Sequence, residues 1–241
     1  MTDPRLDIIT SRLENVEKII AVSSGKGGVG KSVVASTLAI RLKEQGHNVG
    51  LLDLDFTSPV SHVILGIEGL YPEEEFGIIP PLAHGLRYMS ITYYSQDEPV
   101  PLRGVDISNA IIELLAITLW GNLDYLIVDM PPGIGDAILD VIRLIERIHF
   151  LVVCIPSKVA YETVRKQIKL LHELNIPTIG IVENMVMKPT MYVSERAKED
   201  NIAYLGAINY DPTLEDALGE VELLKKTEFY DSIMDLTNKV D

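Results

Sequence analysis

Short apolar runs alternate with longer amphipathic stretches along almost the whole chain. Nearly continuous apolar runs are typical of strands that helices cover on both faces. Strands are predicted at residues 19–22, 49–52, 126–128, 150–155 and 179–182, with weaker candidates at 87–91 and 202–205. Helices are predicted at 32–44, 107–119, 137–147, 159–174 and 229–236. This alternation predicts an α/β fold with a mostly parallel central sheet flanked by helices on both faces.

The pattern runs through residues 1–241 without repeats or a low-complexity linker, which predicts a single domain. Residues 1–17 place Leu6, Ile9, Leu13 and Val16 at helical spacing, so a short amphipathic helix is expected, packed against the sheet edge. Residues 67–101 are rich in glycine, proline and acidic residues and are interpreted as an insertion loop within the domain.

Charge and cysteine content narrow the function classes. The formal net charge is −14, which argues against direct binding to nucleic acid or to an anionic membrane surface. The single cysteine, Cys154, excludes an intrachain disulfide and any CxxC metal site within one chain. The first residues are charged rather than apolar, so no signal peptide is predicted and a cytoplasmic location is expected.

The strongest chemical signal follows the first predicted strand and opens the first predicted helix. It fits the phosphate-loop pattern G-x-x-x-x-G-K-[ST] and consists of Gly25, Lys26, Gly27, Gly28, Val29, Gly30, Lys31 and Ser32. Glycines let the backbone curl around a polyphosphate, and the helix amino terminus adds its positive dipole end. Lys31 is expected to reach the β- and γ-phosphates, and the Ser32 hydroxyl to bind Mg²⁺.

Carboxylates follow two of the predicted strands. Asp53 and Asp55 end the second strand on one side, where ligands bind in open α/β sheets, although the pair could also only terminate the strand or cap a helix. Asp129 ends another apolar strand in the Walker B arrangement, which places a carboxylate beside Mg²⁺. Pro131, Pro132 and Gly133 follow it, and Gly133 can approach the γ-phosphate closely.

The second lysine of the loop, Lys26, makes it the deviant form KGGVGKS, which resembles the MinD, ParA, ArsA and Mrp group of P-loop ATPases. The resemblance implies slow, dimer-dependent hydrolysis of ATP to ADP by a homodimer that forms in the ATP state. Lys26 then acts on the partner's phosphates, and the catalytic residues are Lys26, Lys31 and Asp55. It further implies that Asp55 orients the attacking water in switch I and that Asp53 supports Mg²⁺.

Two further residues are assigned to the nucleotide by the same resemblance. Asn184 stands in the run Val-Glu-Asn-Met, which resembles the segment that contacts adenine in Mrp proteins. Asp211 lies where the family's later loop passes the base. The alternative for Asn184 is a structural role in a turn at the end of a strand.

The closest resemblance is to the Mrp/NBP35 branch. It rests on the run at 129–136, which contains Pro131, Pro132 and Gly133 and resembles that branch's switch II, and on the strings at 99–104 and 120–125. Carriers of that branch place a CxxC pair soon after Val-Glu-Asn-Met, to hold an iron–sulfur cluster between two subunits. This chain has methionines there, Met187 and Met191, for which core or interface packing is expected. No intrinsic iron–sulfur or nickel site is therefore predicted, and Cys154 is expected to be buried in its strand.

The strings at 50–56 and 90–94 resemble the cysteine-free archaeal Mrp/MinD-type HypB proteins of [NiFe]-hydrogenase maturation. The main hypothesis is therefore an ATP-driven switch for metallocentre assembly, with a nickel metallochaperone or an apo-metalloprotein client as partner. An alternative is an iron–sulfur assembly ATPase whose cluster ligands come from a second protein. Another alternative is a positioning switch of the MinD/ParA type.

Overall fold

The computed structural model describes residues 3–95 and 105–240. The last part of the predicted insertion, 96–101, and the whole string at 99–104 lie outside the described residues.

The central sheet has eight strands in the order β10-β9-β8-β1-β7-β2-β6-β5. Neighbouring strands are parallel except for the short edge strand β5, which pairs antiparallel with β6. The strands are β1 (Val16–Ser24), β2 (Val49–Asp53), β5 (Leu82–Ala83), β6 (Leu86–Ser90), β7 (Leu123–Asp129), β8 (Ile148–Cys154), β9 (Thr178–Val186) and β10 (Tyr204–Asn209). A separate hairpin pairs β3 (Glu73–Glu74) with β4 (Ile78–Ile79). The predicted fold class is confirmed.

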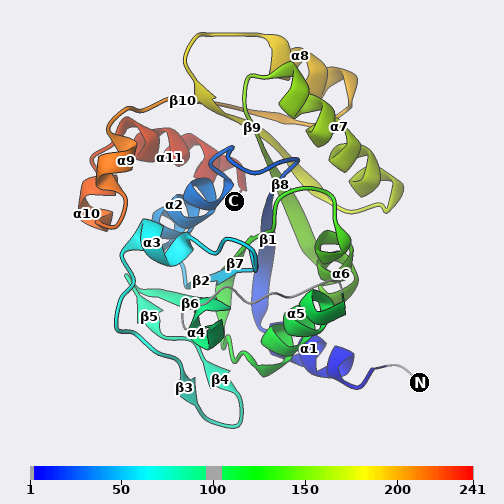
Figure 1. Cartoon of the computed structure of the whole chain (residues 1–241), viewed down its shortest axis with the longest axis vertical. Helices are drawn as coiled ribbons and strands as arrows, with labels where there is room; N and C mark the ends of the chain where they lie inside the picture. Colours follow the sequence, from blue (N-terminus) through cyan, green and yellow to red (C-terminus); the bar gives the residue numbers. More distant parts are fainter. Residues whose placement is uncertain (1–2, 96–104, 241) are drawn as a thin grey trace.

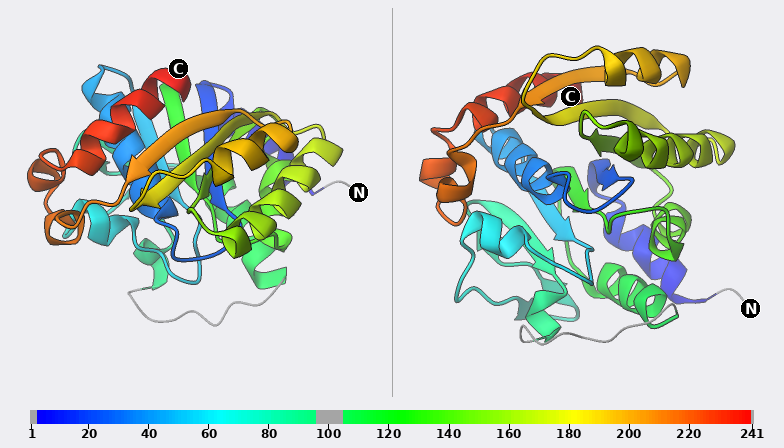
Figure 2. Two further views of the ribbon diagram at one scale, coloured as in Figure 1. Left: turned by 90° about the horizontal axis from the view of Figure 1, so that it is seen from above. Right: turned by 45° about the horizontal axis from the view of Figure 1, so that its top comes forward.

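Helices cover both faces of the sheet (Figures 1 and 2). One face carries α1 (Arg5–Leu13), α5 (Val105–Ile117), α6 (Asp136–Leu144), α7 (Lys158–Glu173) and α8 (Tyr192–Glu199). The other carries α2 (Lys31–Glu44), α3 (Ser61–Leu65), α10 (Val221–Leu224) and α11 (Glu228–Val240), with α9 (Leu214–Ala217) beside them. The short α4 (Thr92–Ser95) follows β6. Among the residues that the structure describes, every helix is too short or too polar to cross a bilayer.

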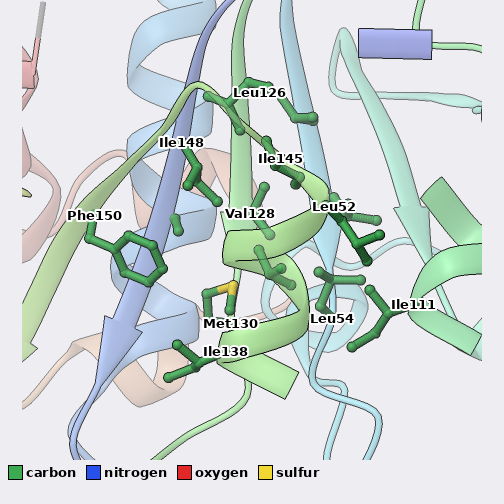
Figure 3. Close-up of a cluster of buried hydrophobic side chains, with 14 of the residues drawn as sticks. Leu52, Leu54, Ile111, Leu126, Val128, Met130, Ile138, Ile145, Ile148 and Phe150 are labelled. Carbon is green, nitrogen blue, oxygen red and sulfur yellow. The ribbon is translucent and has the colours of Figure 1, made fainter. Parts of the chain in front are cut away.

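The core explains why the strands read as continuous apolar runs. Leu126, Val128 and Met130 point from β7 and its end toward α6, where Ile138 and Ile145 meet them (Figure 3). Each of these side chains is at most 2% exposed, and burying one stabilises the fold by about 1.5–3 kcal/mol. The opposite face of the sheet packs against α2 and α11. The strands are thus fixed from both sides, and their carboxyl ends form a rigid edge.

Two sequence-based interpretations need correction. Residues 67–101 are not simply a loop, because they contain the β3–β4 hairpin and two strands of the main sheet, β5 and β6. Of these, β6 confirms the weaker strand candidate at 87–91, whereas β3, β4 and β5 have only two residues each and are too short to show a periodicity. The amino-terminal helix is present as α1, but it packs its buried Ile9 and Leu13 on the α5 side of the sheet rather than at an edge.

Candidate functional site

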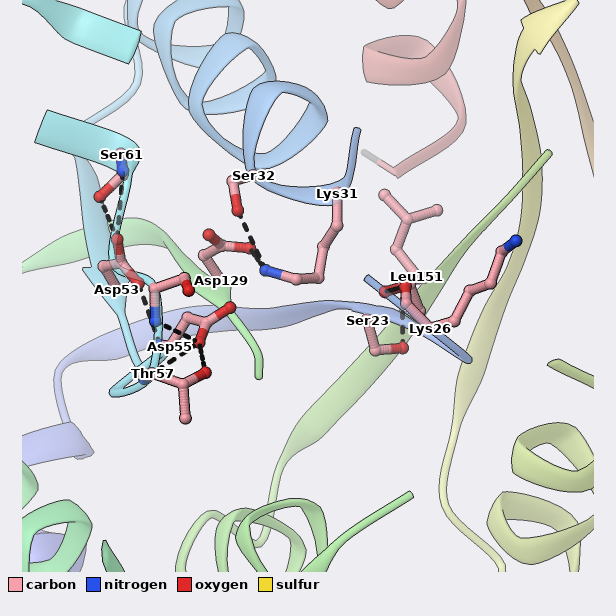
Figure 4. A network of polar contacts seen from close by, with 12 residues as sticks. Ser23, Lys26, Lys31, Ser32, Asp53, Asp55, Thr57, Ser61, Asp129 and Leu151 are labelled. Carbon is pink, nitrogen blue, oxygen red and sulfur yellow. Dashed lines mark hydrogen bonds and ion pairs between the residues drawn. The ribbon is translucent and has the colours of Figure 1, made fainter. Parts of the chain in front are cut away.

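Three loops meet at the carboxyl edge of the sheet because β7 lies between β1 and β2. The phosphate loop follows β1, the switch II segment follows β7, and the switch I segment follows β2. Asp129 at the end of β7 is in register with Val22 of β1 and with Asp53 of β2. The order of the strands thus brings together residues that are more than a hundred positions apart in the sequence (Figure 4).

The phosphate loop has the backbone that the glycine pattern predicts. Gly28 and Gly30 are left-handed, with φ of 76° and 81°, where a side chain would be strained. A Cβ atom added to Gly27 or Gly28 would meet only open space, whereas one on Gly30 would lie 2.3 Å from Asn184 Nδ2. The loop is therefore packed tightly on one side and leaves an open cradle on the other.

Lys31 of the phosphate loop and Asp129 of β7 form a buried ion pair. Lys31 donates a hydrogen bond to Asp129 Oδ1, and its ammonium group lies 3.1 Å from Ser32 Oγ (Figure 4). Lys31 is 6% exposed and Asp129 is fully buried. Burial raises the pKa of Asp129, the ammonium group of Lys31 lowers it, and the neighbouring carboxylate of Asp53 raises it again. The pairing keeps a buried positive charge where the phosphates of a nucleotide would bind.

These residues fit a magnesium ion. The second oxygen of Asp129, Oδ2, is buried and has no hydrogen-bond partner among the described residues. The hydroxyl of Ser32 lies beside the same carboxylate. Carboxylate and hydroxyl oxygens are hard ligands of the kind Mg²⁺ prefers, together with phosphate oxygens and water. Ser32 and Asp129 are therefore suited to hold the ion, as their sequence motifs predict.

Asp53 is occupied by the protein itself. Its Oδ1 accepts a hydrogen bond from the Asp55 amide at 3.0 Å, and its Oδ2 accepts bonds from the Ser61 amide at 3.2 Å and hydroxyl at 2.5 Å. It is fully buried, and burial raises its pKa. Asp53 therefore ties the end of β2 to the start of α3. Support of Mg²⁺ by Asp53 through water stays a prediction. Direct ligation by Oδ2 would require the hydrogen bonds from Ser61 to break.

Asp55 lies beyond the end of β2 and shapes the switch I turn. Its Oδ1 accepts hydrogen bonds from the Thr57 hydroxyl at 2.7 Å and from the Ser58 amide at 3.1 Å. It lines a cavity of about 330 Å³ together with the phosphate loop, Thr57 and Pro132. The carboxylate thus faces the space for the phosphates while it is held by its own loop. Orientation of the attacking water by Asp55 remains a prediction.

Switch II approaches the phosphate loop from the other side. The Gly133 amide donates to the Ser24 carbonyl at 2.9 Å, which joins the end of β7 to the end of β1. Gly133 has a φ of 89°, and a Cβ atom there would meet nothing. The preceding Pro131 and Pro132 restrict the backbone, and Pro132 lines the cavity. The segment is therefore placed to contact a γ-phosphate.

Lys26 differs from Lys31 in its surroundings. Its amine points away from Lys31 and from the cavity side of the loop (Figure 4). It is partly exposed and forms no ion pair with any residue in the parts of the chain that the structure covers. A loop lysine with this orientation contributes nothing to the phosphate cradle of its own subunit. Its action across a dimer stays a prediction.

The two predicted base contacts are engaged elsewhere in this structure. Asn184 is 2% exposed and donates from Nδ2 to the Val29 carbonyl at 2.9 Å, so it buttresses the phosphate loop from β9. Asp211 accepts hydrogen bonds from Thr213 and from the Phe229 amide at the start of α11. These bonds lower its pKa. Both residues act structurally here, and their contacts with adenine are untested predictions.

The loop after β9 is open and lacks thiols. Met187 and Met191 are 75% and 68% exposed, so core packing, one of the two roles expected for them, is wrong. Cys154 is buried as expected, and burial raises its pKa to about 12. Within residues 3–95 and 105–240, no group of three or more histidine, cysteine or acidic side chains is arranged to hold a metal ion.

Sequence reasoning missed the residues that hold Asp53 in place. Ser61 begins α3, and its hydroxyl lies 2.9 Å from the Tyr88 hydroxyl on β6. A serine followed by an apolar run is a helix-start signal and could have identified Ser61. Nothing in the local pattern marks Tyr88, because its role depends on the pairing of β6 with β2.

A family model agrees with this architecture. The ParA family model described as NUBPL iron-transfer P-loop NTPase matches residues 15–240. Among curated proteins, the iron–sulfur cluster carrier protein of Aquifex aeolicus is 38% identical over 217 residues, covering 83% of this chain and 60% of the relative. The carrier of Saccharolobus solfataricus is 36% identical over 236 residues, covering 90% of this chain and 80% of the relative. The chain spans about 60% of the length of the first such relatives.

Solved structures of nucleotide-binding proteins also match this chain. The nucleotide-binding protein of Archaeoglobus fulgidus, in complex with ADP and with cobalt found in it, has a TM-score of 0.78 at 32% identity. That match covers 92% of this chain and 93% of the other. The cell-division ATPase MinD of Pyrococcus furiosus has a TM-score of 0.66 at 18% identity, covering 93% and 98%. The second likeness shows the fold alone.

Proposed function

The chain belongs to the Mrp/NBP35 iron–sulfur cluster carrier family of MinD/ParA P-loop NTPases, and from this premise we propose that it is an ATP-hydrolysing switch in iron–sulfur cluster assembly. It handles the cluster with a second protein that supplies the thiolates. One observation carries this proposal: the phosphate site is complete, whereas residues 186–191 after β9 contain no cysteine.

Iron–sulfur chemistry is favoured over the nickel role that was the main sequence-based hypothesis. The relatives described above are named iron–sulfur cluster carriers, and none of them is named for nickel or hydrogenase maturation. The strings that favoured a hydrogenase-maturation protein, at 50–56 and 90–94, are short. The comparisons therefore support the alternative reading of the sequence better. A positioning role rests on the shared fold only.

The nucleotide chemistry follows from the charges in the site. In this structure Lys31 neutralises Asp129, and both are buried. Phosphates in the cradle would give Lys31 a new partner, and Ser32 and Asp129 are the residues that would hold Mg²⁺, which would supply positive charge beside the phosphates. This exchange leaves no buried charge unpaired, because each partner of the present ion pair gains a new one.

Dimer formation in the ATP state provides the switch. Lys26 is partly exposed and points away from its own cradle, which favours contact with the phosphates of another subunit. A cation that arrives in trans stabilises the charge of the transition state, in the way arginine fingers act in related NTPases. Hydrolysis then removes the γ-phosphate that this contact depends on. The two nucleotide states therefore differ in subunit association, and a partner protein can bind one of them preferentially.

The test is a comparison of what copurifies with the two states. Asp55→Ala is held in MgATP, where it is expected to bind nucleotide but hydrolyse it about 100-fold more slowly, and wild type is held in MgADP. We expect a protein with iron and acid-labile sulfide to copurify with one state only. Lys31→Ala, whose affinity for both nucleotides should be about 100-fold lower, is the matched control.

Metal analysis separates the alternatives. Nickel in the state-specific complex would restore the hydrogenase-maturation hypothesis. Absence of both metals from state-specific complexes would contradict a role in metallocentre assembly and favour a positioning or regulatory switch.

A further inference from the structure

A second and larger cavity lies beside switch I. Its volume is about 620 Å³, within the range of sites that bind ligands or inserted side chains. It is formed by α3 with the chain after it, by β6 and α4, and by the turn between α9 and α10. That turn is packed closely against α3, because the Gly219 amide donates to the Ile64 carbonyl at 3.0 Å and a Cβ atom on Gly66 would clash with the Gly219 carbonyl.

The mouth of this cavity is apolar. Val63, Leu70 and Tyr71 line it and are 58%, 39% and 75% exposed. Large apolar side chains that gather around a cavity mark contact sites more often than scattered ones do. Deeper in the cavity the wall is formed by Tyr88, which is fully buried, and by Tyr93. The exposed apolar side chains therefore offer contacts to an aliphatic or aromatic side chain, beside the polar groups of His62, Glu68 and Thr92 that also line the cavity.

The carboxylate among the residues that line the cavity is that of Glu68. Residues 60–83 and 210–224, which contribute most of its wall, contain no lysine or arginine. The two segments carry the acidic residues Glu68, Glu73, Glu74, Glu75, Asp211, Glu215, Asp216, Glu220 and Glu222, of which Asp211 is buried among its own hydrogen bonds and Glu222 is paired with Lys225. Of these, Glu68 lines the cavity, and Glu220 directly follows the lining residue Gly219. Complementary charge therefore favours a basic partner and disfavours an acidic one.

A chain of hydrogen bonds joins this cavity to the nucleotide site. The Ser61 hydroxyl gives its proton to Asp53 Oδ2 at 2.5 Å, so the Tyr88 hydroxyl donates to Ser61 Oγ at 2.9 Å. Tyr88 lines the cavity, Ser61 begins α3, and Asp53 lies beside the Lys31–Asp129 pair. A change of switch I that moves Asp53 or Ser61 therefore changes what holds the Tyr88 side chain.

The wall also contains polar atoms that lack partners. His62 Nδ1 and the Tyr93 hydroxyl are buried without a hydrogen-bond partner among the described residues. Such atoms cost about 1–3 kcal/mol each. A polypeptide brings its own N–H and C=O groups, so small movements of the wall would allow both atoms to be satisfied. This favours a peptide segment over a purely apolar ligand.

We propose that this cavity is the docking site of a basic protein segment that inserts an apolar side chain, and that Ser61 and Tyr88 couple its occupancy to the nucleotide. The coupling rests on the proposed function, since it requires switch I to change with the nucleotide, whereas the docking does not.

The probe is the peptide acetyl-Lys-Phe-Lys-amide, titrated into the full chain and followed by the NMR signals of α3 and of the α9–α10 turn. Acetyl-Glu-Phe-Glu-amide tests the charge, and acetyl-Lys-Ala-Lys-amide tests the apolar anchor. We expect the first peptide to bind at least about fivefold more tightly than either control, a difference of about 1 kcal/mol. Equal binding of the three peptides, or no binding at millimolar concentration, overturns the docking site.

Variants locate the binding and separate it from the coupling. Val63→Lys should weaken binding about fivefold, because it removes an apolar contact and adds a repelling charge, whereas Leu174→Lys, at an exposed site elsewhere, should not. Binding that is unaffected by Val63→Lys overturns the site. Affinity for the peptide is then compared in MgADP and in a non-hydrolysable ATP analogue, with an expected difference of at least about threefold.

Ser61→Ala changes no residue that lines the cavity, so it should keep peptide binding while it abolishes the difference between nucleotide states. Retention of the difference in Ser61→Ala overturns the coupling. Nucleotide binding is measured in the same samples with a fluorescent ADP. A chain that binds the peptide but no nucleotide contradicts the proposed function and leaves the docking site standing, whereas the reverse contradicts only the docking site.

Discussion

The phosphate loop and the loop after β9 lie at the same edge of one sheet, but only the phosphate loop contains the binding residues that its family pattern predicts. The phosphate loop ends at Lys31, which forms a buried ion pair with Asp129, and Asn184 of β9 supports the loop. The loop after β9 exposes Met187 and Met191 where the family's carriers place cysteines. The strand β9 supports the phosphate loop through Asn184 and directly precedes the second loop, so this difference cannot be attributed to a loss of β9.

The difference shows which part of a carrier this chain retains. The residues predicted to bind a nucleotide are held by the core, whereas the loop after β9 contains no cysteine that would bind iron through sulfur. This difference is the basis of our proposal that the chain changes its state with the nucleotide and that a second protein holds the cluster. Substitutions in either loop test this difference.

The largest effect is expected from Lys26→Ala. Loss of a cation that stabilises the transition state from the partner subunit should lower ATP hydrolysis about 1,000-fold. Affinity for ADP should stay unchanged, because Lys26 lies outside its own cradle. Single-turnover hydrolysis and a fluorescent ADP titration measure both. Normal hydrolysis by this variant as a monomer would show that Lys26 does not act in trans.

Lys31→Ala should lower nucleotide affinity about 100-fold, or about 2.7 kcal/mol, since it removes the cation of the cradle. It also leaves Asp129 buried and unpaired, so the free energy of unfolding should fall. Calorimetric titration with ADP and thermal unfolding measure the two effects. Lys43→Ala, at the carboxyl end of α2, is the matched control. Tight ADP binding by Lys31→Ala would mean that the site lies elsewhere.

The double substitution Met187→Cys/Thr190→Cys tests the loop after β9, because it introduces the CxxC spacing there. After anaerobic reconstitution we expect about two iron atoms per chain, which corresponds to one four-iron cluster between two subunits. Met187→Ser/Thr190→Ser should bind none and controls for the loss of the methionine side chain. If the cysteine variant stays free of iron, the loop geometry, and not only the ligand type, differs from that of a carrier.

The smallest effect is expected from Cys154→Ala. Removal of the buried sulfur should lower the free energy of unfolding by about 1 kcal/mol through the cavity that it leaves. Nucleotide binding and the iron content of complexes with a partner should not change, because the thiol is inaccessible and its pKa is raised to about 12. Loss of iron in this variant would assign the cysteine a role that its burial argues against.

The sequence predicts the regular elements of the sheet because buried strands and long amphipathic helices have strong periodicity. It also identifies Lys31, Ser32 and Asp129, since their motif depends on local spacing. It does not identify the role of Ser61, which begins α3 and holds Asp53, or of Tyr88, which lies on β6 and reaches Ser61 because β6 pairs with β2. Tertiary pairing decides these contacts, and no short pattern records it.

Asp55 and Asn184 illustrate a second limit. The motif places both residues near the nucleotide, and the structure does bring both to the phosphate loop region. In the structure, however, Asp55 holds the switch I turn and Asn184 holds the Val29 carbonyl. A motif names the residues of a site, whereas their hydrogen-bond partners in a given state follow from the packing around them.

The central claim is that this chain carries the nucleotide switch and leaves the cluster to a second protein. Its most direct test is anaerobic reconstitution of the unmodified chain with ferrous iron and sulfide in MgATP, followed by gel filtration and counting of iron and sulfide. The account predicts a protein peak with bound nucleotide and no iron above the background of the serine variant. A stoichiometric cluster on the unmodified chain would contradict it.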